Sequence, residues 1–200
     1  MIVKRYRLGI VVGLLIFPFA NILAADTVAY DIASILAKLK ENIGPITKLI
    51  FAISYLIGFV FVGSALMRLK EVGKSMSASA SPDGIKGSIV KLLIGIVLIY
   101  LPSTINIGVA TFWGNSKILE YTSDSSGTLG EAKEGAVALM QIIGYVSFVR
   151  GLILLNRASQ SNAQPGTVGK GILHLVGGVL SINIVGTLEI VQNTFGLNIL

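Results

Sequence analysis

Few residues in this chain combine in a way that could do chemistry. His174 is the single histidine, and the 200 residues contain no cysteine. Disulfides, thiolate metal sites and thiol nucleophiles are therefore excluded. One histidine without a neighbouring carboxylate is neither a metal centre nor a general base, and no spacing of the serines and acids assembles them around it. We expect a protein that is not an enzyme and uses no metal or cofactor.

Polar residues inside apolar stretches are the remaining candidates for function. Arg150 lies seven residues before Arg157, or roughly 10 Å from the end of its helix. Glu189 lies roughly 25 Å from the same side on a helix that runs the other way, so the two differ by about 15 Å in depth and no ion pair is expected within one subunit. Arg150 is interpreted as a snorkelling side chain or a subunit contact, Glu189 as an interfacial carboxylate, and Asn183 as an interhelical hydrogen-bonding residue.

Small residues at helical spacing predict close helix packing. Gly177 is followed at four residues by Ser181, and Gly178 at eight residues by Gly186. Such residues let two helix backbones approach closely. Together with Gly95, Arg150, Asn183 and Glu189, Gly177 and Gly178 are our candidates for helix-packing or subunit contacts.

The segments that position these residues have the apolar composition of segments that lie in a lipid bilayer. Apolar residues make up 53% of the chain and charged residues 13%, and the mean hydropathy is +0.80. The formal net charge is +6, of which Lys4, Arg5 and Arg7 supply three. The remaining charge is too small and too dispersed to predict nucleic-acid binding.

The N-terminal region reads as an export signal. Residues 1–25 join a basic start, an apolar run and the small residues Ala24 and Ala25, after either of which cleavage is expected; an uncleaved anchor helix is the alternative. Residues 26–44 place apolar side chains at helical spacing and predict a periplasmic amphipathic helix that stops at Gly44 and Pro45.

Four stretches are long enough to cross a bilayer: residues 49–67, 92–112, 136–155 and 172–195. Pro102 is expected to kink the second. The loop after the first stretch is rich in Lys and Arg and the next loop in acids, so the positive-inside rule predicts that both mature termini are periplasmic. The expected organisation is a first transmembrane hairpin (45–113) with a basic cytoplasmic loop, a periplasmic loop (114–135) and a second hairpin (136–200).

The two hairpins read as an internal repeat. Residues 57–60 (IGFV) and 143–146 (IGYV) each lead through a small or polar loop with a proline to a second apolar segment. That segment is 91–98 (KLLIGIVL) in the first hairpin and 174–181 (HLVGGVLS) in the second. Because each unit holds an even number of spans, the two copies should enter the membrane in the same direction, as a parallel repeat.

The exported leader, the duplicated hairpin and the stretch 164–178 (QPGTVGKGILHLVGG) followed by Asn183 and Ile184 resemble the IcmC/DotE group of small inner-membrane proteins. That group belongs to Dot/Icm type IVB secretion systems and has relatives in IncI-type conjugation systems. The resemblance implies a structural subunit of an envelope-spanning translocation complex. It carries over no functional residues to positions in this sequence.

The sequence therefore predicts an all-α integral membrane protein of the bacterial inner membrane, with a leader, an amphipathic helix and four transmembrane helices in two parallel-repeat hairpins. Its expected partners are the lipid bilayer, other membrane subunits of a secretion complex and, as a further option, copies of itself. A pilin-like polymerising subunit and a small channel or transporter are the alternative functions.

Overall fold

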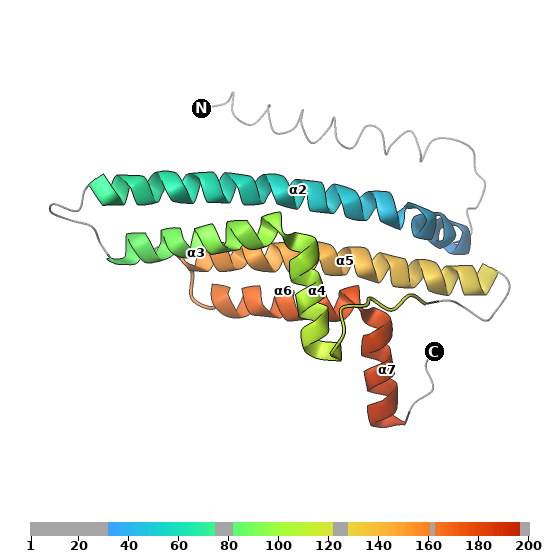
Figure 1. Cartoon of the computed structure of the whole chain (residues 1–200). Coiled ribbons are helices and arrows are strands. Elements are labelled where there is room, and N and C mark those ends of the chain that lie inside the picture. Colours follow the sequence, from blue (N-terminus) through green and yellow to red (C-terminus); the bar gives the residue numbers. More distant parts are fainter. Residues whose placement is uncertain (1–31, 75–81, 122–127, 161–162, 197–200) are drawn as a thin grey trace, which may run out of the picture. The chain divides into compact units, whose positions relative to one another are not determined.

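The computed structural model describes residues 32–74, 82–121, 128–160 and 163–196. Residues 1–25, for which a leader is predicted, lie outside this range, as does the start of the predicted amphipathic helix. Within the described residues every element is a helix, which confirms the all-α class. In chain order they are α2 (Ile32–Lys74), α3 (Pro82–Ile99), α4 (Leu101–Trp113), α5 (Thr128–Ala158), α6 (Thr167–Ile182) and α7 (Ile184–Phe195) (Figure 1).

These helices form two hairpins with the same plan. In each, a long helix is followed by a shorter one that bends sharply into a half-helix: α2, α3 and α4, then α5, α6 and α7 (Figure 1). The two bends measure 91° and 89°. The long helices α2 and α5 pack against each other and run in the same direction, while α3 and α6 return along them. The two units therefore repeat in the same direction, as the sequence predicts.

The long helices are the clearest candidates for membrane spans. Lys38–Lys74 in α2 and Lys133–Ala158 in α5 are long and apolar enough to cross a bilayer, and they contain the predicted spans 49–67 and 136–155. The other two predicted spans, 92–112 and 172–195, fall on the bent pairs α3–α4 and α6–α7. The described residues thus hold two candidate spans, or four if each bent pair crosses as one.

The helix stop predicted at Gly44 and Pro45 is wrong, because α2 continues through both residues. A proline inside a helix removes one backbone hydrogen bond and costs roughly 3 kcal/mol. Contacts with α5 hold α2 on both sides of it. Before the proline, the backbone at Leu36 packs so tightly on Gly135 that a Cβ at Gly135 would clash with the Leu36 carbonyl group. After it, the Phe51 ring meets the Tyr145 ring edge-on at 5.4 Å.

The core lies between the two hairpins. Leu98, Leu101 and Ile105, around the bend of the first hairpin, are fully buried. They join a cluster with Phe148 and Ile182 of the second hairpin. In lipid, where apolar side chains gain little by leaving the solvent, such a cluster stabilises through van der Waals packing. The bends are therefore built into the best-packed part of the chain.

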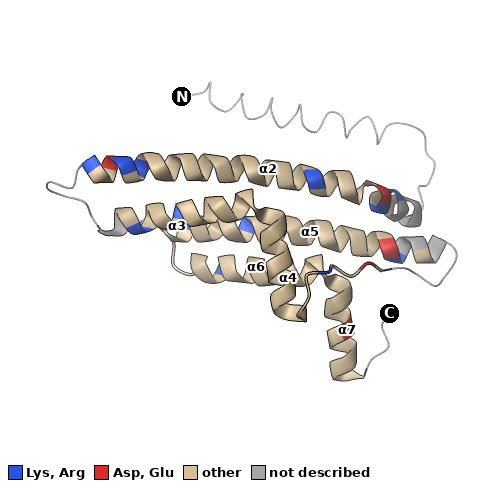
Figure 2. Ribbon diagram, viewed as in Figure 1, with Lys and Arg blue, Asp and Glu red and all other residues tan. Residues whose placement is uncertain are grey.

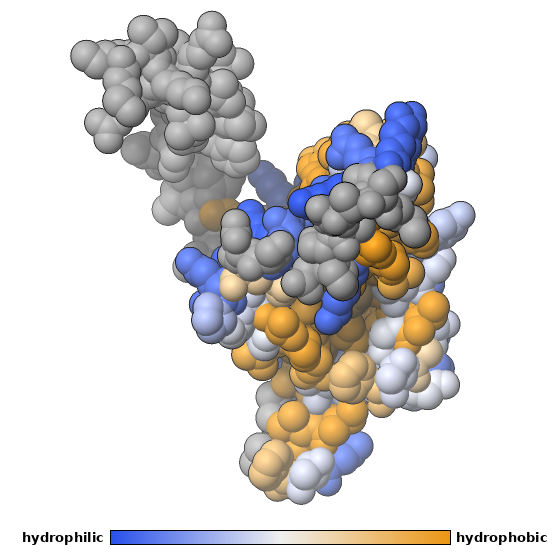
Figure 3. Space-filling model, turned by 90° about the vertical axis from the view of Figure 1, so that its left-hand side faces the viewer, coloured by the Kyte–Doolittle hydropathy of each residue, from blue (hydrophilic) through white to orange (hydrophobic). Residues whose placement is uncertain are grey.

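Charged residues concentrate away from this core. Lys and Arg gather where α2 ends and α3 begins, and acidic and basic residues mix near the opposite ends of α2 and α5 (Figure 2). We call the first region the basic end; it carries Arg68, Lys70, Lys74, Lys86 and Lys91. Viewed from that end, apolar side chains cover much of the lower part of the molecule, toward which the half-helices project (Figure 3).

Candidate functional site at the helix breaks

A glycine contact joins the two arms of the first hairpin. A Cβ added to Gly58 would lie 2.7 Å from the carbonyl oxygen of Gly95, and a Cβ added to Gly95 would lie 3.0 Å from the carbonyl oxygen of Gly58. Real Cβ atoms do not approach backbone so closely, so no side chain fits at either position without moving a helix. Gly95, a predicted packing residue, lies where the backbones of α2 and α3 touch.

The second hairpin repeats this contact at the equivalent residues. Gly144 and Gly178 face each other, with added Cβ atoms at 2.9 Å and 3.0 Å from the opposite carbonyl oxygens. Gly151 and Gly171 form a further contact of the same kind. By contrast, a Cβ on Gly177 would meet nothing within 4 Å. The two glycines predicted as packing residues therefore differ. Gly178 lies in the contact between α5 and α6, while Gly177 faces outward and stays a candidate for a subunit contact.

Each bend follows its packing glycine by five residues, at Tyr100 and Asn183. The two residues adopt nearly the same backbone conformation, with φ −95° and ψ 32° at Tyr100 and φ −105° and ψ 55° at Asn183. Their N–H groups donate to Ile96 and Val179, which are also equivalent in the repeat. Local backbone geometry therefore makes the same break twice.

A threonine four residues after each break donates its hydroxyl to a carbonyl group of the helix before the break, that of Val97 or Leu180, and also contacts the carbonyl at the break, which accepts the threonine N–H. Thr187 Oγ1 donates to the carbonyl oxygens of Leu180 at 2.7 Å and Asn183 at 3.0 Å. Thr104 Oγ1 makes the equivalent bonds to Val97 at 3.4 Å and Tyr100 at 3.1 Å. In hydrocarbon an unsatisfied carbonyl would cost several kcal/mol, on the order of the values for polar groups without partners. These hydroxyls permit a right-angled bend inside an apolar chain.

Proline is not the common cause of the breaks. Pro102, for which a kink is predicted, lies in the first turn of α4, where a helix needs no N–H from it. The chain bends two residues earlier, at Tyr100, and the second break at Asn183 has no proline nearby. The signal that sequence reasoning missed is the matched threonine: Thr104 and Thr187 each lie nine residues after a packing glycine.

The surroundings of the two breaks differ. Asn183 is completely buried, and its Oδ1 accepts a hydrogen bond from the backbone N–H of Leu119 at 3.0 Å. Leu119 belongs to the non-helical segment after α4, so this bond joins the second break to a loop and not, as predicted for Asn183, to another helix. The Trp113 indole also reaches this point, since a Cβ on Gly186 would lie 2.7 Å from its Nε1. Tyr100, in contrast, is 64% exposed.

Arg150 and Glu189 are both exposed and form no ion pair with each other in the described part of the chain. Gly171 lies beside Gly151, so Ile172 of α6 lies at the level of Arg150 of α5. The prediction from the sequence places Ile172 at the level of the C-terminal end of α5. From Ile172, α6 runs eleven residues, or roughly 16 Å, to the break at Asn183, after which α7 turns aside. Arg150 and Glu189 are therefore still separated by about 15 Å along the α5 axis, as predicted. The break at Asn183, and not the length of a straight helix, sets this separation.

Arg150 lies on an otherwise apolar face of α5. Ile143 and Val146 on the same helix are each 51% exposed, and Arg150 follows Val146 by four residues. Residues at this spacing share one side of a helix. An arginine on such a face must either extend to the membrane surface or meet a partner.

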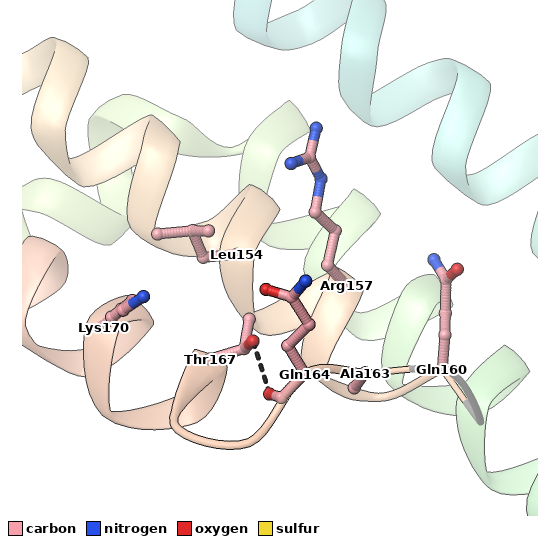
Figure 4. Close-up of a pocket in the computed structure, with 7 residues that line it drawn as sticks. All are labelled: Leu154, Arg157, Gln160, Ala163, Gln164, Thr167 and Lys170. Carbon is pink, nitrogen blue, oxygen red and sulfur yellow. Dashed lines mark hydrogen bonds between the residues drawn. The ribbon is translucent and has the colours of Figure 1, made fainter.

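A pocket of about 510 Å³ lies where α5 ends and α6 begins. Figure 4 shows its walls, which come from the end of α5, the following turn and the start of α6. Arg157 and Lys170 supply two cations, and Leu154 supplies an apolar wall. Among the described residues that line it, none is acidic. Thr167 Oγ1 donates to the Gln164 carbonyl oxygen and fixes the turn. Such a pocket can attract an anionic group, as basic pockets at membrane surfaces do.

Comparison of the chain with protein-family models, with curated proteins and with solved structures found no match.

Proposed function

We propose that this chain is a structural subunit of a bacterial inner-membrane complex, namely a type IVB secretion apparatus of the Dot/Icm kind or a related conjugation apparatus, and that it contributes to assembly of the envelope-spanning complex. The observation that carries the structural part is the doubled packing unit: the same glycine contact and the same break are built twice. The resemblance of residues 164–178 and of Asn183–Ile184 to IcmC/DotE proteins carries the choice of apparatus.

The use of polar groups supports a structural role. Inside the apolar helices, hydroxyl groups donate to backbone carbonyls: Ser54 to Ile50, Ser147 to His174, and Ser181 to Met140. The last two bonds cross from α5 to α6 or back, and so they hold the second hairpin together. These three serine hydroxyls are occupied by bonds to the helix backbone.

Exposed apolar surface supports a role in assembly. On α2, the side chains of Leu56, Phe59 and Val60 are each more than 60% exposed. Lipid covers such a face in a lone membrane protein, and neighbouring subunits cover it in a complex. The described residues add little mass outside the apolar helices, so partners must supply whatever the assembly does in the aqueous compartments.

Placement in the membrane follows from the charges. With the basic end in the cytoplasm, as the positive-inside rule directs, α2 and α5 begin on the periplasmic side. Lys40 and Glu134 form an ion pair there, between the outer ends of the two long helices. The C-terminal half-helix α7 then lies toward the periplasm, and so does the mature N-terminus.

The test is recovery from the native host. A tagged chain is extracted in mild detergent, separated on a native gel and analysed by mass spectrometry. We expect it in a large assembly with secretion ATPases or other envelope subunits. The Gly178→Leu variant should lose these partners. The Gly177→Leu variant is the control, and it should lose only a partner that binds at Gly177 itself. Migration of the wild-type chain as a small particle without partners would overturn the proposal.

A small channel or transporter is the second candidate, and the two breaks favour it. Broken helices in membranes often place backbone groups around a substrate path. Of the two pockets described, one lies where α5 ends and α6 begins, away from the breaks, and the other is lined by Glu120 and Gln141, near the second break. Ion or solute flux into proteoliposomes that stops in Arg150→Gln would move the assignment to this class.

A further inference from the structure

The same face of the repeat is covered in one hairpin and bare in the other. In the second hairpin, Val179 is 4% exposed and Asn183 fully buried. Their equivalents in the first hairpin, Ile96 and Tyr100, are 43% and 64% exposed. The next two equivalent pairs follow the same rule, with Val185 and Gly186 buried and Pro102 and Ser103 exposed. We call the four residues of the first hairpin, Ile96, Tyr100, Pro102 and Ser103, the open break face.

The first hairpin itself supplies the cover on the second. Three contacts from one stretch of chain make it: Gly108 packs on Val179, Trp113 reaches Gly186, and the Leu119 N–H bonds to Asn183. That stretch is the half-helix α4 and the segment after it. The half-helix of one unit thus caps the break of the next unit.

We propose that the open break face binds the α7 half-helix of a second copy of this chain. In the repeat, α7 occupies the position in the second hairpin that α4 occupies in the first, and among the described residues α7 caps no break of another hairpin. On α7, Ile190 is 48% and Phe195 71% exposed, beside the exposed polar residues Glu189, Asn193 and Thr194. The contact between copies would continue the series of contacts that already exists within one chain.

At the proposed contact between copies, the residues are larger than the equivalent residues at the contact inside one chain. Val191 of α7 takes the place of Gly108, so α7 must stand farther from α3 than α4 stands from α6. Tyr100 takes the place of Asn183, and its longer side chain reaches across the wider gap. The interface is head to tail, because different surfaces of the two copies meet. Such contacts build rings or open filaments and not closed two-fold dimers.

Cysteine cross-linking tests the contact directly, because the chain has no cysteine of its own. The variant Ile96→Cys with Val191→Cys is oxidised in native membranes and resolved on non-reducing gels. We expect a ladder of dimer, trimer and larger products. The single variants alone should give none of these, and mixing them in one cell should give dimer only.

The matched control is the contact inside the chain. Gly108→Cys with Val179→Cys places two thiols where a Cβ on Gly108 lies 3.1 Å from the Val179 side chain. Oxidation should protect both thiols from a maleimide–polyethylene glycol reagent without raising the molecular mass, which also reports that the hairpins have folded. A second intermolecular pair, Ile96→Cys with Phe195→Cys, allows for a shift of one helical turn.

Two results would overturn the inference. The first is protection in the control pair with no ladder from either intermolecular pair, which assigns the open break face to lipid or another protein. The second is a dimer from Ile96→Cys alone, which indicates a two-fold contact. The inference rests on the proposed function and deepens it by naming a partner. If the chain co-purifies with secretion subunits but gives no cross-linked ladder, only the inference is wrong. If the ladder forms but no other subunits co-purify, only the secretion role is wrong.

Discussion

The two breaks are alike in backbone and unlike in surroundings. At Tyr100 and Asn183 the chain turns by about a right angle with matched hydrogen bonds and a matched threonine. Yet Asn183 is buried under the first hairpin, while Tyr100 is open. The comparison separates two causes. Residues within one repeat make the bend, and a neighbouring repeat decides whether the bend is buried or exposed.

The largest effect should come from the packing glycines that both hairpins need. In Gly178→Leu the new side chain meets the backbone of Phe148 and the carbonyl of Gly144 at about 3 Å, and neither can move without separating α5 from α6. We expect a loss of more than about 3 kcal/mol in the free energy of unfolding. Titration with sodium dodecyl sulfate in mild detergent measures it.

Gly177→Leu is the control, because its side chain enters open space. It should change the free energy of unfolding by no more than about 0.5 kcal/mol. Because leucine favours helix more than glycine does, equal losses in the two variants could not come from helix propensity and would show that the contact at Gly178 does not set the effect.

The next effect distinguishes the buried break from the open one. Asn183→Leu removes the acceptor of the Leu119 N–H and should cost about 1–3 kcal/mol. Tyr100→Leu, at the equivalent exposed residue, should stay within about 0.5 kcal/mol in the isolated chain. The same detergent titration compares them. A larger loss at Tyr100 would show that the first break is already capped in solution.

A smaller difference is expected between the threonines. Thr187→Val should cost about 0.5–1.5 kcal/mol because its hydroxyl bonds at 2.7 Å and 3.0 Å. Thr104→Val should cost less, since the equivalent bonds measure 3.4 Å and 3.1 Å. If the order is reversed, the threonine of the first hairpin supports its break more than the geometry implies.

The smallest effect is expected at the ion pair that joins the N-terminal ends of α2 and α5. Lys40 and Glu134 form an ion pair whose lysine side chain is 51% exposed. Lys40→Gln should cost about 0.2–1 kcal/mol, and less at high salt. Its effect should add to that of Asn183→Leu, because the two sites share no partner. A double-mutant comparison that departs from additivity by more than about 0.5 kcal/mol would show that the two sites are coupled.

Sequence predicts the helical class, the two hairpins and their common direction, because apolar stretches and a repeat are local signals. The alignment of the repeat also pairs Gly95 with Gly178, which the structure places at equivalent backbone contacts. Sequence does not separate Gly177 from Gly178, since one residue turns the side chain by about 100° and only the position of α5 decides which glycine meets it.

The breaks lie beyond what hydropathy can predict. Residues 92–112 and 172–195 read as continuous spans, because a right-angled bend leaves the composition unchanged. Pro102 predicts a bend at one of them, yet the hydroxyls of Thr104 and Thr187 accompany both. At Pro45 the local rule predicts a stop, and packing of α2 on α5 overrides it. Long-range contacts decide both outcomes.

The right-angled half-helices have a mechanical consequence for the bilayer. Gly58 lies at the middle of the apolar stretch 49–67, and the break at Tyr100 lies five residues beyond its partner Gly95, or roughly 7 Å along α3. With α2 along the membrane normal, the half-helices rest inside the leaflet opposite the basic end, whose hydrocarbon is roughly 15 Å thick. Each displaces roughly 20 Å by 10 Å of lipid from that leaflet alone. In that orientation the chain would act as a wedge, and a row of such chains would bend the membrane.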